Sequence, residues 1–402
     1  MAQTSITESK TSPLRILRFA GAFSAWVIGS GFATGQEILQ FVSSYGYHSF
    51  WVLLVLLIGF SVMGSTITLT AFDHSHQRRG PEDRAGAEAS AGEAPAGSAA
   101  SEASAGEEPV EFHHYRYFCG RFGTVYEWIV PFMQVIPLSI LLSGAGATLY
   151  EYYGLNHTLG VLLMAVLVLL TYYAGFERLT NVVAIAGPLI IFFTLVVGVI
   201  TLIRDMGNFS QVAAWEPLLA TKQAVPGWFS SGVLYTSLNF VCGSVYYTQL
   251  GAAAQSRREV RLGTALGVAA LLAIVCISST AILLNAGDTA ALDIPTLFLA
   301  KKISPVLGAL FSVVLPLGIY SSAATGLFVV TTTFSANVLF IRQHIRLSAF
   351  IITTIAFTIG VFSFGNLIGF FYPILGLLGI IFTACVFIQW GRRLVRKPDP
   401  AR

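Results

Sequence analysis

The sequence predicts an all-α integral membrane protein that forms a single transmembrane domain over residues 1–402. Hydrophobic residues make up 55% of the chain and charged residues only 11%, whereas a soluble domain carries about 25% charged residues. Ten apolar segments approach or exceed the roughly 20 residues that a spanning helix needs. These ten predicted transmembrane helices are residues 14–44, 47–72, 123–153, 157–175, 179–203, 226–250, 260–285, 304–340, 347–365 and 367–390.

The basic residues predict how these helices are oriented. If the N-terminus is cytoplasmic, Arg204, Lys222, Lys301 and Lys302 fall outside and all the other Lys and Arg residues fall inside. Cytoplasmic loops carry the excess of Lys and Arg in membrane proteins. The sequence therefore predicts a multi-pass protein of the plasma (inner) membrane with both termini cytoplasmic. With an odd number of helices the basic residues would no longer separate onto one side of the membrane, so this distribution also supports ten helices.

The first predicted helix contains a glycine-rich stretch at about mid-membrane depth. Gly29, Gly31 and Gly35 lie close together, with Ser30 and Thr34 between them. Glycine weakens a helix by about 1 kcal/mol per position. Non-helical backbone at membrane depth is tolerated only inside the protein or beside a cavity. The stretch therefore predicts a break in helix 1 beside a polar pocket.

A similar stretch in the second half predicts a second break. Residues 237–244, in the sixth predicted helix, again combine glycine with small polar side chains. Interrupted segments in corresponding places of two halves point to the binding site of a secondary transporter. The expected function is therefore transport by alternating access.

Short sequence matches between the halves predict an internal repeat. The words at 135–140 and 314–319 share the pattern Val, hydrophobic, Pro, Leu, any residue, Ile. An Asn precedes both Pro188 and Pro373 by seven residues. These landmarks occur in the same order and at similar intervals, which divides the chain into five helices plus five. Because each half has an odd number of spans, the second half runs inverted.

Residues 80–109 differ in kind from the rest of the chain. They consist mainly of Ala, Gly, Ser, Glu and Pro, with no large apolar residue. Such a segment cannot bury enough surface to offset its ordering entropy. We expect a disordered cytoplasmic loop between helices 2 and 3. It is either a tolerated insertion or a segment for regulation or partner binding.

The words from Gly29 to Glu37, Gly-Ser-Gly-Phe-Ala-Thr-Gly-Gln-Glu, resemble the YkvI family of bacterial membrane proteins, which are regarded as amino-acid permeases. The wider pattern of ten helices, an inverted repeat and breaks in helices 1 and 6 resembles the LeuT-type fold of the amino acid–polyamine–cation superfamily. This resemblance covers the chain apart from residues 80–109. It implies a LeuT-type transporter with helices 1 and 6 broken.

The resemblance also implies a Na⁺ site between helices 1 and 8. Backbone carbonyls of Ala25 and Ile28 would come from helix 1, and oxygens of Gly318, Ser321 and Ser322 from helix 8. The spacing in helix 8 places these three residues near one helical face. A different explanation of the serine pair is that both hydroxyls bond back to helical carbonyls or hold helices together.

Two departures from similar transporters bear on the coupling ion. Phe32 occupies the helix 1 position at which some members carry an Asn for a second Na⁺, and helix 7 lacks a mid-membrane Asn. Proton-coupled relatives often carry a Lys in helix 5, and residues 181–203 contain none. These departures favour one Na⁺ as the coupling ion.

The predicted substrate pocket lies between the two breaks. A substrate carboxylate would bind at the exposed N–H groups near Gly29, Ser30, Gly31 and Phe32, at the positive end of a half-helix dipole. The amine would face helix 6. The helix 6 residues of this predicted pocket are Thr236, Ser237, Asn239, Phe240, Val241 and Cys242, and Gln134 and Pro137 would come from helix 3. The apolar lining favours a small neutral amino acid, although Asn239 could instead serve only to hold helices together.

Glu37 is the best acidic candidate, and the sequence places it one to two turns beyond the break, on the outward half of helix 1. A carboxylate within the membrane costs a few kcal/mol and is a functional candidate. Glu37 could gate the pathway or carry a proton, so a proton-coupled transporter remains an alternative to the Na⁺ symporter.

Other classes of function fit the sequence less well. No channel filter such as TVGYG occurs, and no set of catalytic or metal-ligating side chains stands out, so we expect neither a channel nor an enzyme. A non-transporting membrane sensor remains an alternative function. We expect no cofactor beyond Na⁺ as coupling ion. The expected partners are a small-molecule substrate and the lipid bilayer, and not nucleic acid.

Overall fold

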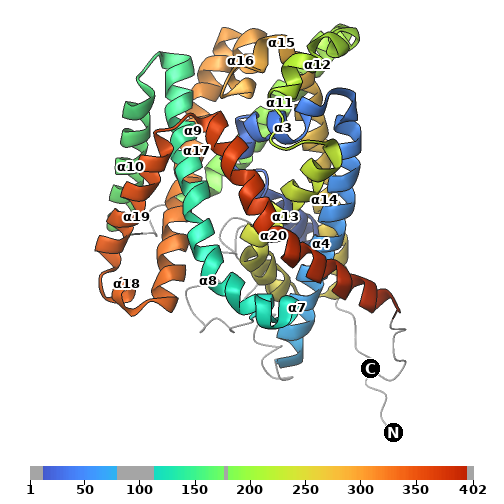
Figure 1. Cartoon of the computed structure of the whole chain (residues 1–402), viewed down its shortest axis with the longest axis vertical. Coiled ribbons are helices and arrows are strands. Elements are labelled where there is room, and N and C mark those ends of the chain that lie inside the picture. Colours follow the sequence, from blue (N-terminus) through green and yellow to red (C-terminus); the bar gives the residue numbers. More distant parts are fainter. Residues whose placement is uncertain (1–11, 79–112, 176–179, 396–402) are drawn as a thin grey trace.

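The computed structural model describes residues 12–78, 113–175 and 180–395, and its regular elements in these ranges are all helical (Figure 1). The predicted disordered loop at 80–109 lies outside the described residues. The elements of the first half are α1 (Pro13–Ala25), α2 (Ser30–Ala33), α3 (Gln36–Phe41), η1 (Ser43–His48), α4 (Ser49–Arg78), α7 (His114–Cys119), η2 (Gly120–Phe122), α8 (Gly123–Met133), α9 (Val135–Tyr153), α10 (His157–Ala174) and α11 (Thr180–Asp205). Those of the second half are η4 (Met206–Gln211), α12 (Val212–Ala220), α13 (Trp228–Ala253), α14 (Arg257–Leu283), α15 (Ala286–Thr289), α16 (Pro295–Ile303), α17 (Pro305–Asn337), α18 (Leu339–Gln343), α19 (Ile345–Gly360) and α20 (Phe364–Val395).

The chain is a multi-pass membrane protein. Within the described ranges, 7 helical stretches are long and apolar enough to cross a membrane: Ser43–His76, His114–Tyr153, His157–Ala174, Gly187–Ala220, Arg257–Leu283, Pro305–Ser335 and Phe364–Arg393. The shorter apolar helix Ile345–Gly360 falls in the ninth predicted span. The remaining two predicted spans are the broken first segment and α13, so the count of ten stays a prediction.

The two ends of the helical bundle differ in their short elements. The elements α12, α15 and α16 gather at the upper end in Figure 1, whereas α7 and α18 lie at the lower end. The lower elements carry Arg116 and Arg342, and the upper helix α16 carries Lys301 and Lys302. The sequence did not predict α12, α15 or α16, because their apolar runs are too short to span a bilayer.

The predicted break in the first helix is confirmed. The helix α1 ends at Ala25, the backbone of Gly29 is extended, and α2 begins at Ser30. A second interruption follows at Gly35, whose φ of 85° lies in the left-handed region that favours glycine. The short helix α3 then starts at Gln36. The glycines therefore convert one spanning segment into three short helices.

The predicted break within 226–250 is wrong, because α13 runs without interruption from Trp228 to Ala253. Its small polar residues hydrogen-bond to its own backbone: the Ser237 hydroxyl donates to the Val233 carbonyl, and the Asn239 amide donates to the Tyr235 carbonyl, both at 2.8 Å. Its glycines instead leave room for neighbouring segments, since a Cβ on Gly243 would overlap the indole of Trp26, just after α1.

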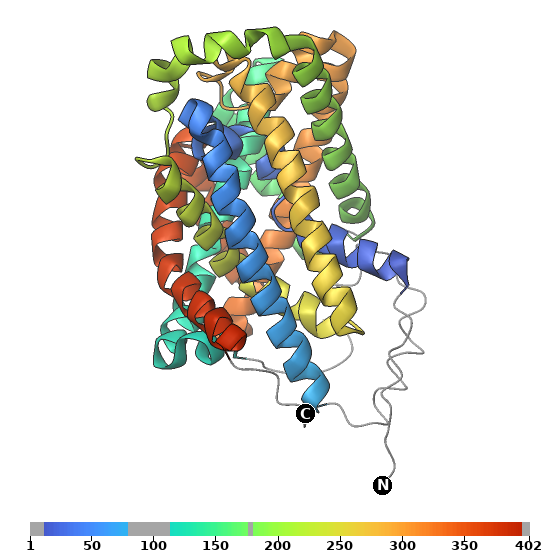
Figure 2. The ribbon, with the colours of Figure 1, turned by 90° about the vertical axis from the view of Figure 1, so that its right-hand side faces the viewer.

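The helix α13 packs most extensively against α4 and α20. Figure 2 shows α4 in blue running beside α14 in yellow, and these two also pack together. Gly251 of α13 lies directly on the backbone of Thr68 in α4, where an added Cβ would overlap the Thr68 carbonyl oxygen. Small residues at such contacts let membrane helices approach closely.

We expect Gly251→Ala to destabilise the protein by about 1–3 kcal/mol, because the Thr68 backbone cannot move aside as a side chain could. The matched control is Gly326→Ala in α17, where nothing lies within 4 Å of the added Cβ. That change should be neutral or slightly stabilising. Thermal unfolding of both variants in detergent measures the difference, and equal midpoints would contradict the close α4–α13 contact.

Candidate functional site

The carboxyl group of Glu37 joins the broken first segment to two long helices. Glu37 follows Gly35 in the first turn of α3 and is 8% exposed. The Tyr235 hydroxyl of α13 donates to Oε2 at 3.1 Å, and the Tyr372 hydroxyl of α20 donates to Oε1 at 2.9 Å. Within the described residues, no Lys, Arg or His forms an ion pair with this carboxyl.

The same carboxyl lies against the backbone of the break. A Cβ built on Gly31 would be 2.6 Å from Oε1 of Glu37, so only glycine leaves room for the carboxyl in this position. The Thr34 hydroxyl donates to the Gly31 carbonyl at 2.6 Å and accepts from the Gln36 N–H at 3.2 Å, which ties the two sides of Gly35 together. Glu37 therefore lies beside the predicted substrate position and not a turn or more beyond it.

Aromatic side chains surround this part of the molecule. The Trp26 indole N–H donates to the Asn239 carbonyl at 3.2 Å, and its ring stacks on Tyr246 with centroids 5.3 Å apart. The Tyr246 hydroxyl donates to the Ala22 carbonyl at 2.7 Å, near the end of α1. Phe41 contacts the ring of Tyr235. These contacts fix α13 against both sides of the break.

The predicted helix 6 residues do not all face the break. Thr236 lies against Gly59 of α4, Phe240 packs on Phe60 of α4, and the Ser237 hydroxyl accepts from Thr383 of α20 at 3.0 Å. An unbroken helix turns about 100° per residue, so consecutive residues point in different directions. The face toward the first segment carries the predicted residue Asn239 together with Tyr235 and Tyr246, which were not predicted.

The remaining predicted pocket residues occupy varied surroundings. The Gln134 amide, at the junction of α8 and α9, donates to the Cys242 carbonyl at 2.9 Å, so the structure does bring these two residues together. Phe32 is 1% exposed and belongs to the hydrophobic core. Nothing lies within 4 Å of a Cβ placed on Gly29. The side chain of Ser30 lies outside the described part of the structure.

Unused oxygen atoms remain on four of the five predicted Na⁺ ligands, namely Ala25, Ile28, Ser321 and Ser322. Among the described residues, no N–H or O–H group donates to the carbonyls of Ala25 and Ile28, and neither the Ser321 nor the Ser322 hydroxyl forms a hydrogen bond. The serine pair therefore does not bond back to its own helix, unlike Thr325, which donates to the Ser321 carbonyl at 3.0 Å. The helix α17 packs on α2. Assembly of the oxygens around one ion stays a prediction.

A polar cluster, formed by Glu151, Asp293, Gly365 and Gln40, covers the side of the break nearer the upper end. Glu151 Oε1 accepts from the Asp293 N–H at 2.7 Å, and Asp293 Oδ1 accepts from the Gly365 N–H at 3.0 Å. The Gln40 amide donates to the Gly365 carbonyl at 2.8 Å. The cluster therefore ties α3, the last part of the broken first segment, to the start of α20, to the segment before α16 and to α9.

Sequence reasoning missed Tyr235, Tyr372 and Trp26. Tyr235 and Asn239 are one helical turn apart, which would have placed them on one face of an unbroken helix. Tyr372 directly precedes Pro373 in α20. Aromatic residues make up 13% of the chain. Being aromatic therefore does not distinguish Tyr235, Tyr372 or Trp26 from the many others.

Comparison with known proteins gives one relative of similar length. No family model matches the chain. It is 22% identical over 379 residues to the uncharacterized membrane protein YkvI of Bacillus subtilis (strain 168), covering 94% of this chain and 96% of that protein. The likeness extends along nearly the whole chain.

Solved structures give only a distant likeness. One is a crystal structure of a mutant of the Eremococcus coleocola manganese transporter, with 14% identity and a TM-score of 0.39, covering 95% of this chain and 73% of that one. Another is the same transporter in complex with an aromatic bis-isothiourea substituted compound, with 16% identity and a TM-score of 0.38, covering 94% and 72% of the two chains.

Proposed function

We propose that this chain is a secondary transporter for a small neutral amino acid or a related solute, with Glu37 as the group that couples transport to protons. The observation that carries the proposal is the Glu37 carboxyl, which lies beside the broken backbone at Gly31 without a cationic partner in the described residues. Ionisable side chains in such positions mark ion and proton pathways.

The position of Glu37 accounts for coupling. A substrate carboxylate at the N–H groups of Gly31 and Phe32 would come close to Oε1 of Glu37. Two carboxylates at one site cannot both stay ionised without a large penalty. Binding of the substrate therefore favours a proton on Glu37, and by linkage the proton favours the substrate to the same degree. The two would cross together.

The tyrosines would transmit protonation to the long helices. An ionised carboxylate only accepts hydrogen bonds, and both Tyr235 and Tyr372 donate to it here. A protonated carboxyl has a donor of its own and keeps part of its acceptor capacity, so its O–H can donate to one of the two tyrosine oxygens and reverse that contact. Protonation thus changes how α3 is held by α13 and α20, and a change of that kind alters which end of the site is open.

The proposal includes a five-plus-five inverted repeat of ten helices, cytoplasmic termini and a place in the plasma membrane. The interrupted first segment beside a buried carboxyl and the marked difference in basic residues between the two ends support these features. The function proposed is transport, and no catalytic step is assigned to the site.

Purified protein in proteoliposomes tests the proposal directly. A panel of radiolabelled neutral amino acids is supplied in Na⁺-free buffer, with the outside about one pH unit more acidic than the lumen. One proton moved across that difference provides about 1.4 kcal/mol, enough for about tenfold accumulation. We expect accumulation of at least one solute. If none accumulates without Na⁺ although Na⁺ restores uptake, proton coupling is wrong.

Na⁺ is the second candidate for the coupling ion. The unused carbonyls of Ala25 and Ile28 and the unused hydroxyls of Ser321 and Ser322 favour it, because Na⁺ would need oxygen ligands of these kinds.

If Na⁺ couples, Ser322→Ala should raise the Na⁺ concentration for half-maximal uptake roughly tenfold, the effect of about 1.4 kcal/mol of lost binding. The helix should persist, since alanine is a good helix former. Ser335→Ala, on the same helix, is the matched control. Unchanged Na⁺ activation in an active Ser322→Ala protein would remove α17 from the ion site.

A further inference from the structure

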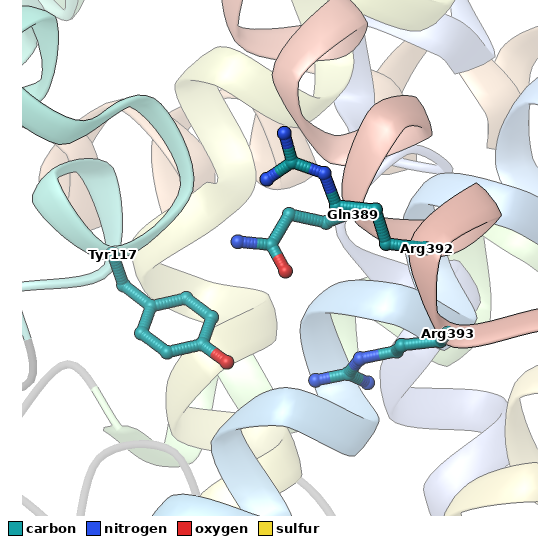
Figure 3. A pocket seen from close by; sticks show the side chains of 4 residues that line it. All are labelled: Tyr117, Gln389, Arg392 and Arg393. Carbon is teal, nitrogen blue, oxygen red and sulfur yellow. The ribbon is translucent and has the colours of Figure 1, made fainter. Parts of the chain in front are cut away.

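A basic pocket opens at the last turns of α20. Its cavity of about 320 Å³ is lined by Tyr117 of α7 and by Gln389, Arg392 and Arg393 of α20 (Figure 3). These four side chains offer two guanidinium groups, a phenol and an amide, and no carboxylate of the described residues lines the pocket. Within the described residues, no ion pair neutralises either arginine.

One of the two arginines is held in place. Arg393 is half-buried, and its Nη2 donates to the hydroxyl oxygen of Thr70 in α4 at 2.8 Å. A guanidinium has five N–H donors in a fixed fork, so most of those on Arg393 remain available. Arg392 is exposed beside it. Paired guanidinium groups of this kind bind planar or tetrahedral oxyanions with strong, charge-assisted hydrogen bonds.

The size of the pocket fits a polyatomic group. A water molecule takes about 30 Å³ of liquid volume, so a cavity of about 320 Å³ holds much more than a single hydrated ion. A phosphate with a small attached headgroup is of suitable size and charge.

The surface next to the pocket is apolar. Leu377, Ile381 and Ile388 of α20 are exposed, at 59%, 56% and 55%. Together with Arg392 they follow the helical spacing of four, seven and four residues, so they form one stripe that leads to the pocket. In a bilayer this stripe faces acyl chains, and the arginines at its end then lie at the level of the lipid headgroups. Basic pockets at this level bind anionic lipid headgroups.

We propose that the pocket of Tyr117, Gln389, Arg392 and Arg393 binds the phosphate of an anionic phospholipid, whose acyl chains lie along the Leu377–Ile388 stripe. The lipid bridges α7 and α20 at the lower end of the bundle. The bound headgroup holds Arg393 in position and so stabilises the packing of α20 on α4, where Arg393 donates a hydrogen bond to Thr70. The same phosphate chemistry occurs in free inorganic phosphate, and the stripe favours the lipid.

The test uses the full chain in detergent micelles. Phosphatidylcholine alone, phosphatidylcholine with increasing phosphatidylglycerol, and inorganic phosphate are added in separate arms. Thermal unfolding and native mass spectrometry report stabilisation and retained lipid. We expect phosphatidylglycerol to raise the unfolding midpoint of the wild-type protein, and Arg392→Gln with Arg393→Gln to require roughly tenfold more of this lipid for the same effect.

The control variant removes two positive charges, as the pocket variant does, from a site near the same end of α4 but outside the pocket. Arg258→Gln with Arg261→Gln changes two exposed arginines near the start of α14, whose neighbour Arg257 pairs with Asp73 of α4 at 2.8 Å. This double variant should respond to phosphatidylglycerol as the wild type does. If the Arg393 change prevents folding, Arg392→Gln alone, which keeps the hydrogen bond to Thr70, serves instead.

Two results would overturn the proposal. The first is an equal response of the pocket variants and the wild type to phosphatidylglycerol. The second is full stabilisation by inorganic phosphate with no further effect of phosphatidylglycerol, which would identify a site for a free anion. Native mass spectra that show phosphatidylglycerol retained by the wild type and the control, and lost from the pocket variants, would support the lipid site.

Discussion

Glu37→Gln should abolish uphill uptake while leaving substrate binding in place. Glutamine has nearly the shape of glutamic acid and can still contact Tyr235 and Tyr372, but it cannot gain or lose a proton. A pH gradient of one unit should then give no accumulation, a loss of about tenfold relative to the wild type. Uptake driven by a pH gradient in proteoliposomes measures this loss.

Exchange of labelled for unlabelled solute provides the internal check for Glu37→Gln. Exchange needs no net proton movement, so the variant should retain it. Glu216→Gln, which changes an exposed carboxylate on α12, is the matched control and should behave as the wild type. Full accumulation by Glu37→Gln would show that another group carries the proton or that a different ion drives transport.

Gly31→Ala should reduce uptake at least as strongly. The added methyl group would be 2.6 Å from Oε1 of Glu37, which is too close, so the carboxyl must turn away and give up its hydrogen bond to Tyr372. The expected result is roughly a tenfold loss of uptake, since displacing a charge-assisted contact costs about 1.5–3 kcal/mol. Uptake at several external pH values is the measurement.

The control for Gly31→Ala lies two residues away. Gly29→Ala places the same methyl group where nothing lies within 4 Å, and the φ of Gly29, −87°, suits alanine. This variant should transport nearly as well as the wild type. Equal losses in the two variants would mean that the break needs glycine for its flexibility and not for contact with Glu37.

The sequence was informative about the first segment and misleading about α13, although both contain glycines and small polar residues. Gly35 has a positive φ, and this conformation by itself favours glycine whatever its neighbours are. The break appears there as predicted. Gly243 instead receives the indole of Trp26. A glycine that bends its own chain and one that admits a neighbour look alike in a sequence, because the difference depends on a distant residue.

Only part of the candidate site could be predicted, because its other residues meet through contacts between distant parts of the chain. The sequence predicts Glu37 as a candidate, since a carboxyl in an apolar segment stands out. Its two partners were not predicted, because Tyr235 and Tyr372 lie 198 and 335 residues away along the chain. A broken helix would place Thr236, Ser237 and Phe240 in the pocket. Because α13 is regular, these residues point toward α4 and α20 instead.

Proton movement that accompanies substrate entry tests the central claim most directly. Wild-type proteoliposomes containing a pH-sensitive dye are given a transported solute in Na⁺-free buffer, with no initial pH gradient. We predict that the lumen acidifies when the solute is added, and that Glu37→Gln proteoliposomes show no acidification under the same conditions. Solute entry without any acidification in the wild-type protein would contradict coupling through Glu37.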